Sequence, residues 1–555
     1  MSTRSLSRKI ALGGAVVVFG FWLLASGFWF LPSGLRAQST LGSIDFPNSG
    51  ARAAQPAFVR GVLLLHSFEF DDAKEAFVEA QKLDPGFAMA YWGEAMTHNH
   101  PLWNQTAPDL AKAALAKLAP TLEGRLAKAP TQKEKDWLAS LEPLYLYGAG
   151  DKAARDLAYA AALRDMHAKY PDDLEVTSFL ALATLGTSGT NRDYAIYMRA
   201  AALAEEAYAK NPRHPGAVHY LIHAYDDPVH APLGLRYANA YGKVAPDASH
   251  ALHMPTHIYF AMGMWDEAAT MNERSAKAAD DRRAAKKLGV EERGYHALQW
   301  LTYTYLQQGR YNDARAMIKQ FEDDVAQASS SGRPRGTLAL ARAAWLVETR
   351  RWADAQPRMA SGLGGDAAAA DLFAIGLAAA KTGNVAAARE ARQQMSAPAP
   401  AGGGNYASQP MAGMPGMGMS SPAPAGAPRP STVMAAELDA VIAFAEGRKD
   451  DAVAFAQKAA AMEDSLSFDF GPPMPIKPAH ELAGELLLDV GRAAEAQKEF
   501  ETQLKRTPGR ALSLLGLARA ATVAKNEAVA RRATDDLRRV WHRADPNVPE
   551  LKEVR

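Results

Sequence analysis

A helix-forming pattern that recurs at a nearly constant interval constrains this chain more than any other feature. From about residue 50 onward, Ala, Leu, Glu, Lys and Arg dominate, and helical stretches of about 12–15 residues alternate with short Gly or Pro breaks. The first clear unit contains Gly61, Ala73, Phe77 and Pro85. Small residues let two antiparallel helices approach closely, and proline ends the second helix before the next pair begins. The sequence therefore predicts an all-α fold of stacked helix hairpins.

The spacing of these four residues resembles the tetratricopeptide repeat (TPR), a unit of about 34 residues with small, aromatic and proline positions in this order. The string FDDAKEAFVEAQKLDPGFAMAYWGEA is close to the consensus of that family. The same frame returns in units that begin at Pro215, Ser249, Tyr295 and Lys477. The resemblance implies a right-handed α-solenoid of helix-turn-helix (TPR-like) repeats over most of residues 54–540. It says little about function, because one fold hosts many functions.

Two longer parts of the sequence are similar to bacterial exported TPR proteins with a His-rich core. The first is HYLIHAYDDPVHAPL, followed shortly by SHALHMPTHIYFAMGMWDEA, and the second is the later string FDFGPPMPIKPAHELAGELL. This resemblance implies the fold and the histidine pattern, and it implies no activity.

The amino-terminal segment has the features of an export signal. Arg4, Arg8 and Lys9 precede an uncharged, mostly apolar run of 22 residues, 10–31. That length matches the roughly 20 residues that cross a bilayer and exceeds the roughly 7–15 of a cleaved signal. We therefore favour a transmembrane signal anchor in residues 1–36 over a cleaved signal peptide, with a buried core helix as a third interpretation. Either signal places the bulk of the chain outside the cytoplasm, tethered to the inner membrane or soluble in the periplasm.

The remaining domain boundaries follow from composition. We interpret residues 37–53 as a linker, residues 54–395 as an N-terminal TPR-like array, and residues 432–545 as C-terminal TPR-like repeats. Between the arrays, residues 396–431 hold 8 Pro and 7 Gly, which predicts a disordered loop. Four methionines of this loop follow one another closely: Met411, Met414, Met417 and Met419. Thioether sulfurs suit Cu(I), although a linker that binds nothing explains the same composition.

Composition excludes several classes of site. The 555 residues include no cysteine, which rules out disulfides, thiolate metal sites, iron–sulfur clusters and a cysteine nucleophile. The 62 basic and 61 acidic side chains give a net charge of +1, which argues against nucleic acid as a partner. Any chemistry must then come from histidine, methionine, carboxylates or the backbone.

Histidine supplies the strongest functional signal, because eight of the 14 in the chain fall in the span from His214 to His296. In the repeat frame, six of these imidazoles and two carboxylates take places that face the concave groove of TPR proteins. These residues are His219, His223, His250, His253, His257, His296, Asp226 and Asp227. The frame therefore predicts that they share adjoining parts of one inner surface.

The spacing of the histidines suits a metal ion. Histidines four residues apart lie on one face of a helix, about 5–6 Å apart at Cβ. The chain has two such pairs on neighbouring helices, His219/His223 and His253/His257. Four imidazoles, with carboxylates as ligands or hydrogen-bond partners, suit Zn(II), Cu(II), Ni(II) or Fe(II). Pro255 weakens the frame for the second pair, because an interior proline breaks or kinks a helix. Two alternatives stay open: histidines that only pack between helices, and a groove whose imidazoles hold an anionic ligand.

The sequence thus predicts an exported binding protein or scaffold whose His-rich concave site holds a divalent transition metal, with a protein or peptide partner in the TPR groove. The first alternative is an adaptor of the cell envelope without metal, to which Trp92, Tyr225 and Tyr259 would contribute contacts. The second is a metal-dependent hydrolase with Asp226 or Asp227 as the base. We favour a protein that is not an enzyme, because no motif supplies an oxyanion donor.

Overall fold

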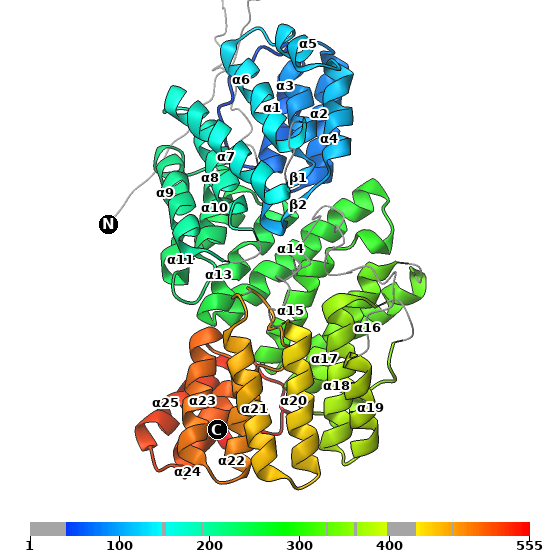
Figure 1. Ribbon diagram of the computed structural model, residues 1–555, viewed down its shortest axis with the longest axis vertical. Helices are drawn as coiled ribbons and strands as arrows, with labels where there is room; N and C mark the ends of the chain where they lie inside the picture. The colour runs from blue at the N-terminus through cyan, green and yellow to red at the C-terminus, as the bar shows by residue number, and fades with distance from the viewer. Residues whose placement is uncertain are drawn as a thin grey trace, which may run out of the picture. The chain divides into compact units, whose positions relative to one another are not determined.

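The computed structural model describes residues 40–554 with the exception of 147–150, 190–191, 329–330, 360–362, 397–428 and 469. The described part of the chain is almost entirely helical (Figure 1). The predicted signal segment 1–36 and the four loop methionines between 411 and 419 lie outside the described residues. Among the helices that the structure describes, none is both long enough and apolar enough to cross a bilayer.

The first half of the described chain contains thirteen labelled helices and one small hairpin. The helices are α1 (Gln55–His66), α2 (Phe70–Leu83), α3 (Ala88–Met96), α4 (Pro108–Leu118), α5 (Leu122–Ala127), α6 (Gln132–Leu141), α7 (Lys152–Lys169), α8 (Leu174–Gly186), α9 (Tyr194–Lys210), α10 (Pro215–Tyr225), α11 (Ala231–Val244), α12 (Ser249–His253) and α13 (Pro255–Met262). The short strands β1 (Asn99–His100) and β2 (Gln105–Thr106) pair antiparallel, with Asn99 opposite Thr106. A 3₁₀ turn, η1 (Pro101–Trp103), and a π turn, η2 (Glu142–Leu146), complete this half.

The second half continues with longer helices. They are α14 (Trp265–Lys286), α15 (Tyr295–Gln307), α16 (Tyr311–Gln327), α17 (Gly332–Thr349), α18 (Gly365–Lys381), α19 (Val385–Ser396), α20 (Pro430–Ala445), α21 (Lys449–Asp464), α22 (Ala479–Asp489), α23 (Ala493–Arg506), α24 (Ala511–Val523), α25 (Glu527–Val540) and α26 (Leu551–Val554). Two 3₁₀ turns, η3 (Val290–Glu292) and η4 (Trp352–Asp354), lie between them.

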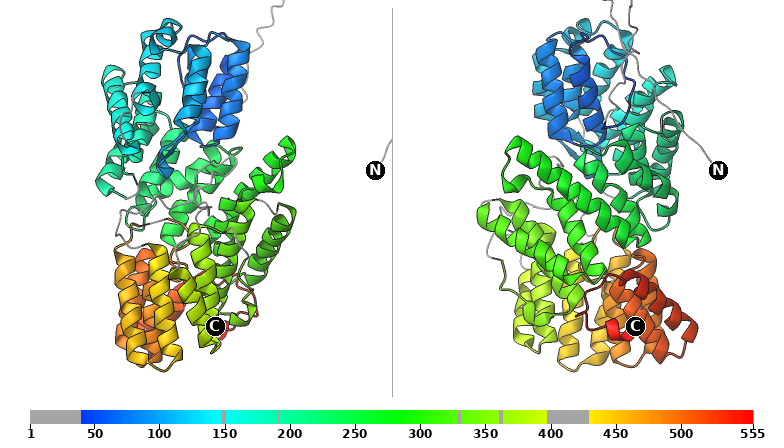
Figure 2. Two further views of the ribbon diagram at one scale, coloured as in Figure 1. Left: turned by 45° about the vertical axis from the view of Figure 1, so that its right-hand side comes forward. Right: turned by 180° about the vertical axis from the view of Figure 1, so that it is seen from behind.

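Consecutive helices pack against each other along most of the chain. Helix α9 contacts both α8 and α10, and α20 to α25 form an unbroken series of such contacts, seen in yellow to red in Figure 2. Helices two places apart also touch, as α18 does α20 and α22 does α24. Contacts restricted to near neighbours are typical of stacked helix hairpins. The prediction of an all-α fold built from repeated hairpins is therefore confirmed.

One packing device occurs in both halves and explains the small and aromatic positions of the repeat. A methyl group on Gly61 would lie 2.8 Å from the ring of Phe77, and a methyl group on Gly93, in the following repeat, would overlap the same ring. Phe500 occupies the equivalent space between Gly484 and Gly516. In each case a buried phenylalanine fills a space that only glycine leaves open, and it joins one hairpin to the next.

The predicted linker is packed against the first helices over its described part. Phe46 is buried, and its ring centroid lies 5.3 Å from that of Phe58 and 5.5 Å from that of Trp137. The Ser49 backbone N–H donates to Glu134 Oε1 at 2.8 Å. Residues 42–50 contain no helix, yet this segment is part of the core rather than a free connection.

Two large apolar cores and one small cluster around Val433 and Ala459 fill the described part of the chain. The first draws its buried side chains from residues 46–303, and the second from residues 269–554. The two overlap on α14 and α15, where Trp300 belongs to the first core and Leu301 to the second. On either side of residues 396–431, where we predicted a division of the array, α18 and α19 pack directly against α20.

The C-terminal repeats pack against the helices α13 to α15, which lie much earlier in the sequence. Residues 466–468 and 470–474, here called the covering segment, precede α22 and include Phe470, whose ring packs against the first core. Nearby, Trp265 Nε1 donates to the carbonyl oxygen of Gly509 at 2.8 Å. The backbone N–H of Ala511 donates to Gln307 Oε1 at 2.9 Å. These bonds join residues 244 and 204 positions apart in the sequence.

A buried network of ion pairs and hydrogen bonds stabilises the contact between the C-terminal repeats and α15. The fully buried guanidinium of Arg510 donates to both carboxylate oxygens of Glu481, at 2.7 and 2.9 Å, and to the hydroxyl of Tyr303 at 2.6 Å. Lys477 Nζ donates to the same carboxylate at 2.7 Å. Burial by itself raises the pKa of Glu481, but the charges of Arg510 and Lys477 more than offset this and hold it below its usual value. The network offsets the cost of burying its charges only while all partners are present.

Substitution of Gly93 tests the packing of Phe77 between hairpins. In Gly93→Ala the added methyl group must displace a buried ring, so we expect the free energy of unfolding to fall by about 1–3 kcal/mol. Thermal unfolding followed by circular dichroism measures the change. The matched control is Gly86→Ala, where the nearest atom to the new methyl group is Asp84 Oδ1 at 3.6 Å, and its unfolding should change by less than about 0.5 kcal/mol. Equal stability of the two variants would contradict the packing described here.

Candidate functional site

Four helices bring the predicted histidines together. The six imidazoles, here called the histidine cluster, come from α10 (His219, His223), α12 (His250, His253), α13 (His257) and α15 (His296). Pro255 separates α12 from α13, as the sequence predicts. Met254, between them, keeps helical dihedral angles of −52° and −38°. The backbone therefore keeps a helical course through Pro255, and α12 and α13 both contribute histidines to the cluster.

The histidine cluster is buried. His296, the most exposed of the six, is 7% exposed, and both Asp226 and Asp227 are fully buried. We predicted that these side chains share one inner surface of the concave groove; in the structure they are buried between helices. The covering segment is one reason, because the Phe470 ring lies 4.5 Å from that of His257 and 6.1 Å from that of His223.

The cluster divides into two sets of three. In the first triad, each of His219, His223 and His250 offers a ligand atom, and these atoms lie within 4.8 Å of one another. The second triad consists of His253, His257 and His296, with the same limit. The triads meet where the ring centroids of His223 and His257 are 5.3 Å apart. The four histidines predicted as one ligand set, His219, His223, His253 and His257, are therefore brought together but are shared between two triads.

Hydrogen bonds fix the orientation of several rings through Nδ1. His219 Nδ1 lies 2.7 Å from the carbonyl oxygen of His66. His253 Nδ1 lies 2.7 Å from Oδ1 of Asn272. A carbonyl oxygen only accepts, so each Nδ1 carries the proton and donates. The Nε2 atom of each of these rings is then unprotonated, which is the form in which imidazole binds a metal.

The carboxylate of Asp226 orients two more rings, one from each triad. Its Oδ2 accepts from Nδ1 of His257 at 2.9 Å and lies 3.4 Å from Nδ1 of His223. Its Oδ1 accepts from the guanidinium of Arg192 at 2.6 Å. Burial alone would raise the pKa of Asp226, but Arg192 and the two imidazoles together hold it below its usual value. Asp226 is thus an ionised acceptor at the boundary of the triads.

Several ring nitrogens of the cluster have no hydrogen-bond partner anywhere in the described part of the chain. They are Nε2 of His223, His253, His257 and His296, and Nδ1 of His250. The Nε2 atoms of His219 and His250 face each other at 3.2 Å. Buried polar groups are nearly always paired, so this many unpaired nitrogens in one place require an explanation.

Burial keeps five of the six imidazoles neutral. Desolvation lowers the pKa of His219, His250, His253 and His296 well below the usual value, and mutual repulsion between the rings lowers it further. Desolvation also lowers the pKa of His257, to about 4, although its bond to Asp226 opposes this. At neutral pH these imidazoles are therefore uncharged, so no proton has to leave before a cation binds.

A third histidine group lies beside the cluster and differs from it in one respect. Glu175 accepts from Nε2 of His66 at 2.8 Å and from Nε2 of His214 at 3.1 Å. The other nitrogen of His66 is bonded to the hydroxyl of Tyr220 at 2.8 Å, and that of His214 accepts from the backbone N–H of Ala217 at 3.1 Å. Every ring nitrogen of this group is used, so the group is a complete structural network. It holds the carbonyl of His66 in place to orient His219.

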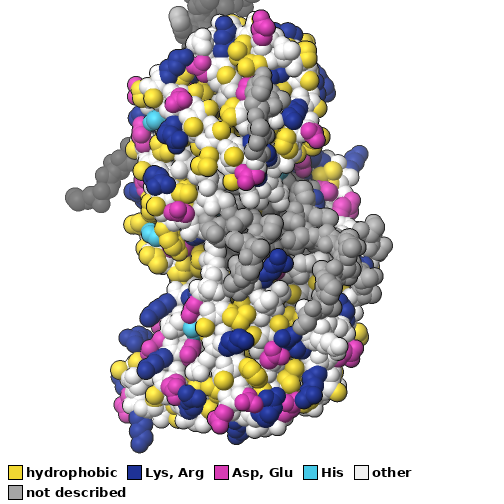
Figure 3. Space-filling model, viewed as in Figure 1, with side chains coloured by type: hydrophobic (Ala, Val, Ile, Leu, Met, Phe, Trp, Pro, Cys, Tyr) yellow, Lys and Arg dark blue, Asp and Glu magenta, His cyan; other side chains and the backbone are white. Residues whose placement is uncertain are grey.

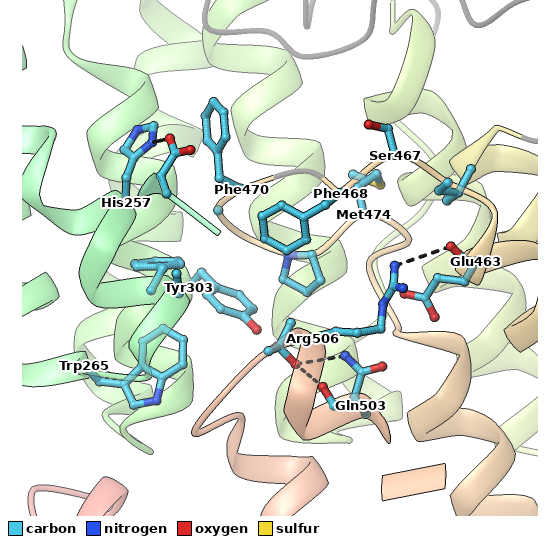
Figure 4. A pocket seen from close by; sticks show the side chains of 17 residues that line it. His257, Trp265, Tyr303, Glu463, Ser467, Phe468, Phe470, Met474, Gln503 and Arg506 are labelled. Atoms are coloured by element: carbon cyan, nitrogen blue, oxygen red, sulfur yellow. Dashed lines mark hydrogen bonds and ion pairs between the residues drawn. The ribbon is translucent and has the colours of Figure 1, made fainter. Parts of the chain in front are cut away.

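A small pocket opens beside the second triad (Figure 4). Its volume is about 70 Å³, which admits a few water molecules or one small ion. His257 and Asp226 line its inner end, and aromatic side chains, among them Tyr303 and Phe470, form its walls. Arg506 lines it too and donates to the carbonyl oxygen of Glu463 at 3.4 Å. The pocket gives the cluster a connection toward the covering segment.

Other residues singled out in the sequence lie away from the cluster or serve the core. Asp227 does not face the imidazoles of the triads: it accepts from His230 Nδ1 at 2.8 Å and pairs with Arg192 at 3.3 Å. Trp92, Tyr225 and Tyr259 are at most 7% exposed, so they do not form a partner surface as we predicted for the adaptor alternative. They pack inside the first core instead.

Four residues of the site could not be found from its sequence pattern. Arg192, Asn272 and Glu175 orient the histidines or their supports, and Phe470 covers them. None belongs to the HxxxH pairs, and Phe470 is 213 positions from His257 along the chain (470 less 257). The only sequence signal was the glycine- and proline-rich string that contains Phe470.

Comparison with known proteins identifies no relative. No protein-family model matches this chain, and neither does any curated protein sequence. Similar solved structures include yeast Tom70 (12% identity, TM-score 0.31, covering 90% of this chain and 92% of that chain). They also include the TPR domain of P58(IPK) (13%, 0.23, 86% and 99%) and the human IFIT1 dimer with m7Gppp-AAAA (13%, 0.31, 90% and 91%). These values are too low to support any inference, and the fold is established by the helix hairpins of the chain itself.

Removal of Glu175 tests whether the third histidine group is structural. In Glu175→Ala the N–H groups of His66 and His214 lose their acceptor while buried, so we expect the free energy of unfolding to fall by at least about 2 kcal/mol. Urea unfolding followed by circular dichroism gives the difference. The control is Glu79→Ala, whose side chain is 53% exposed and paired with exposed Arg60; its effect should be below about 0.5 kcal/mol. A tolerated Glu175→Ala would show that this group does not support the fold.

Proposed function

We propose that this protein is an exported TPR-like scaffold whose histidine cluster holds a divalent transition metal. The observation that carries the proposal is the set of buried ring nitrogens without partners among the described residues, above all Nε2 of His253 and His257, whose Nδ1 atoms are bonded to acceptors. Metal-binding histidines almost always donate their second N–H to a carbonyl or carboxylate, which fixes the ring and makes it a better ligand. The arrangement around His253 and His257 has this form.

The donor set fits Zn(II), Cu(II), Ni(II) or Fe(II). These ions accept imidazole nitrogen, and Zn–N bonds are about 2.0–2.1 Å long. Two nitrogens bound to one tetrahedral ion then lie about 3.3 Å apart. Nε2 of His219 and Nε2 of His250 are already 3.2 Å apart, close to that separation. An ion there would replace a single nitrogen–nitrogen hydrogen bond with two coordinate bonds.

The alternative is that these histidines only pack between helices. It can be judged by comparing the cluster with the histidine group around Glu175 in the same protein. His66 and His214 are equally buried, and both nitrogens of each are hydrogen-bonded. A purely structural histidine network in this fold is thus fully paired. The cluster leaves five nitrogens unpaired among the described residues, each at a cost of about 1–3 kcal/mol. A bound ion removes this cost.

The hydrolase alternative receives no support from the two carboxylates proposed as its base. Asp226 accepts from Arg192 through one oxygen and from His257 through the other. Asp227 accepts from His230 and pairs with Arg192. A general base needs a free oxygen within hydrogen-bond distance of a water or substrate. Both side chains are better suited to orienting the histidines, so we propose a binding protein and not an enzyme.

We further propose that the helical array binds a protein or peptide, and that residues 10–31 export the chain and tether it to the inner membrane. Basic and acidic side chains are interspersed over the face shown in Figure 3, and the net charge is only +1. Partner recognition by shape and local polar contacts fits this surface better than recognition by bulk charge.

Metal content tests the proposal. We expect untagged protein, incubated with Zn(II) and then desalted, to retain zinc, and the double variant His223→Gln/His257→Gln to retain only background amounts, because it removes one ligand from each triad. Elemental analysis by mass spectrometry gives the ratio of metal to protein. His480→Gln is the matched control, since its nitrogens are bonded to Glu499 and Asp464 and not to the cluster.

Thermal unfolding supplies an independent reading. An ion that binds only the folded state stabilises it by mass action, so Zn(II) should raise the melting temperature of the wild-type protein and of His480→Gln, but not that of the double variant. A wild-type protein that retains no metal and shows no shift with Zn(II), Cu(II), Ni(II) or Fe(II) would refute the proposal and leave the metal-free scaffold.

A further inference from the structure

The two triads support an inference about how many ions the cluster holds. We infer that the histidine cluster is a dinuclear centre, with one transition-metal ion bound by His219, His223 and His250 and a second bound by His253, His257 and His296. This inference rests on the proposed function, because it specifies the stoichiometry and geometry of the same site.

No group of ligand atoms within 4.8 Å of one another, among the described residues, includes all six imidazoles. Ligand nitrogens on one ion lie at most about 4.2 Å apart, which is twice a bond of about 2.1 Å. The two His triads found among the described residues have three members each, drawn from adjoining helices. A further group, His223, Asp226 and His257, spans the two triads, and the ring centroids of His223 and His257 are 5.3 Å apart, so the two triads meet there. The rings therefore gather around two centres.

The two centres are adjacent and similarly built. His223 and His257, one from each triad, have ring centroids 5.3 Å apart and share Asp226 as the group facing their Nδ1 atoms. Each triad supplies three nitrogens, which leaves one position of a tetrahedral ion open. Metal sites with three protein ligands commonly take a water or a small ligand at the fourth position. The shared carboxylate couples the orientation of one triad to that of the other.

Charge further defines the centre. The ion group beside the cluster consists of two carboxylates, Asp226 and Asp227, and one guanidinium, Arg192, and has a net charge of −1. Two divalent ions would thus be under-compensated in a buried site, so they require a small anion, such as hydroxide, at their open positions. The pocket of about 70 Å³ that reaches His257 and Asp226 has room for such an anion.

Stoichiometry of binding tests the dinuclear centre. We expect wild-type protein titrated with Zn(II) to bind two ions per chain, by elemental analysis after desalting. His250→Gln should bind one ion, since it disrupts only the first triad, and His296→Gln should also bind one, since it disrupts only the second. The double variant should bind none. His230→Gln is the control from the same region, and it should bind two, because His230 is bonded to Asp227 outside both triads.

Electron paramagnetic resonance of the Cu(II)-loaded protein tests whether the ions are adjacent. Two neighbouring Cu(II) ions couple magnetically, so the signal per copper should be weaker in the wild type than in either single variant. One ion per wild-type chain would overturn the dinuclear centre and leave the proposed function intact, whereas no ion would overturn both. Two ions whose copper signals are uncoupled, or that both survive in His250→Gln and His296→Gln, would also refute it. The wild-type count does not depend on whether any variant folds.

Discussion

The buried carboxylate of Asp226 is the interaction on which the site depends. It lies at the end of α10, where it receives a guanidinium hydrogen bond on one oxygen and faces imidazoles from two different helices with the other. A lone buried carboxylate would be strongly unfavourable, and Arg192 makes it tolerable. Because the ionised carboxylate of Asp226 can only accept hydrogen bonds, Nδ1 of His257 carries the proton and its Nε2 is left unprotonated. The chemistry of the cluster follows from that orientation.

Two kinds of buried polar group coexist in this fold. Around Arg510 and around Glu175 nearly every donor meets an acceptor, and such networks specify how the helices pack. In the histidine cluster the orienting bonds are made while the opposite nitrogens are left free. This contrast, within one protein and at equal burial, is what separates a site prepared for a ligand from a network that only supports the fold.

The sequence was sufficient for the parts of the site governed by local spacing. The repeat frame placed His219, His223, His253 and His257 on facing helices, and HxxxH spacing put each pair on one face. It could not predict that Phe470 covers them, because that contact depends on where the chain returns after two hundred residues. Nor could it predict that α18 packs against α20, because a Pro- and Gly-rich composition indicates where a helix ends and not which helices pack together.

The packing of the covering segment against the histidine cluster changes how stability is distributed along the array. In an open solenoid each repeat contacts only its neighbours. A destabilising change at one end therefore stays local, and unfolding proceeds repeat by repeat. Here Phe470 packs against His257, and the carbonyl oxygen of Gly509 accepts from Trp265. These contacts link repeats from the two halves of the chain directly. Local unfolding of the last hairpins would therefore remove contacts that cover the imidazoles. By the same coupling, a ligand bound in the cluster would stabilise the carboxyl-terminal hairpins.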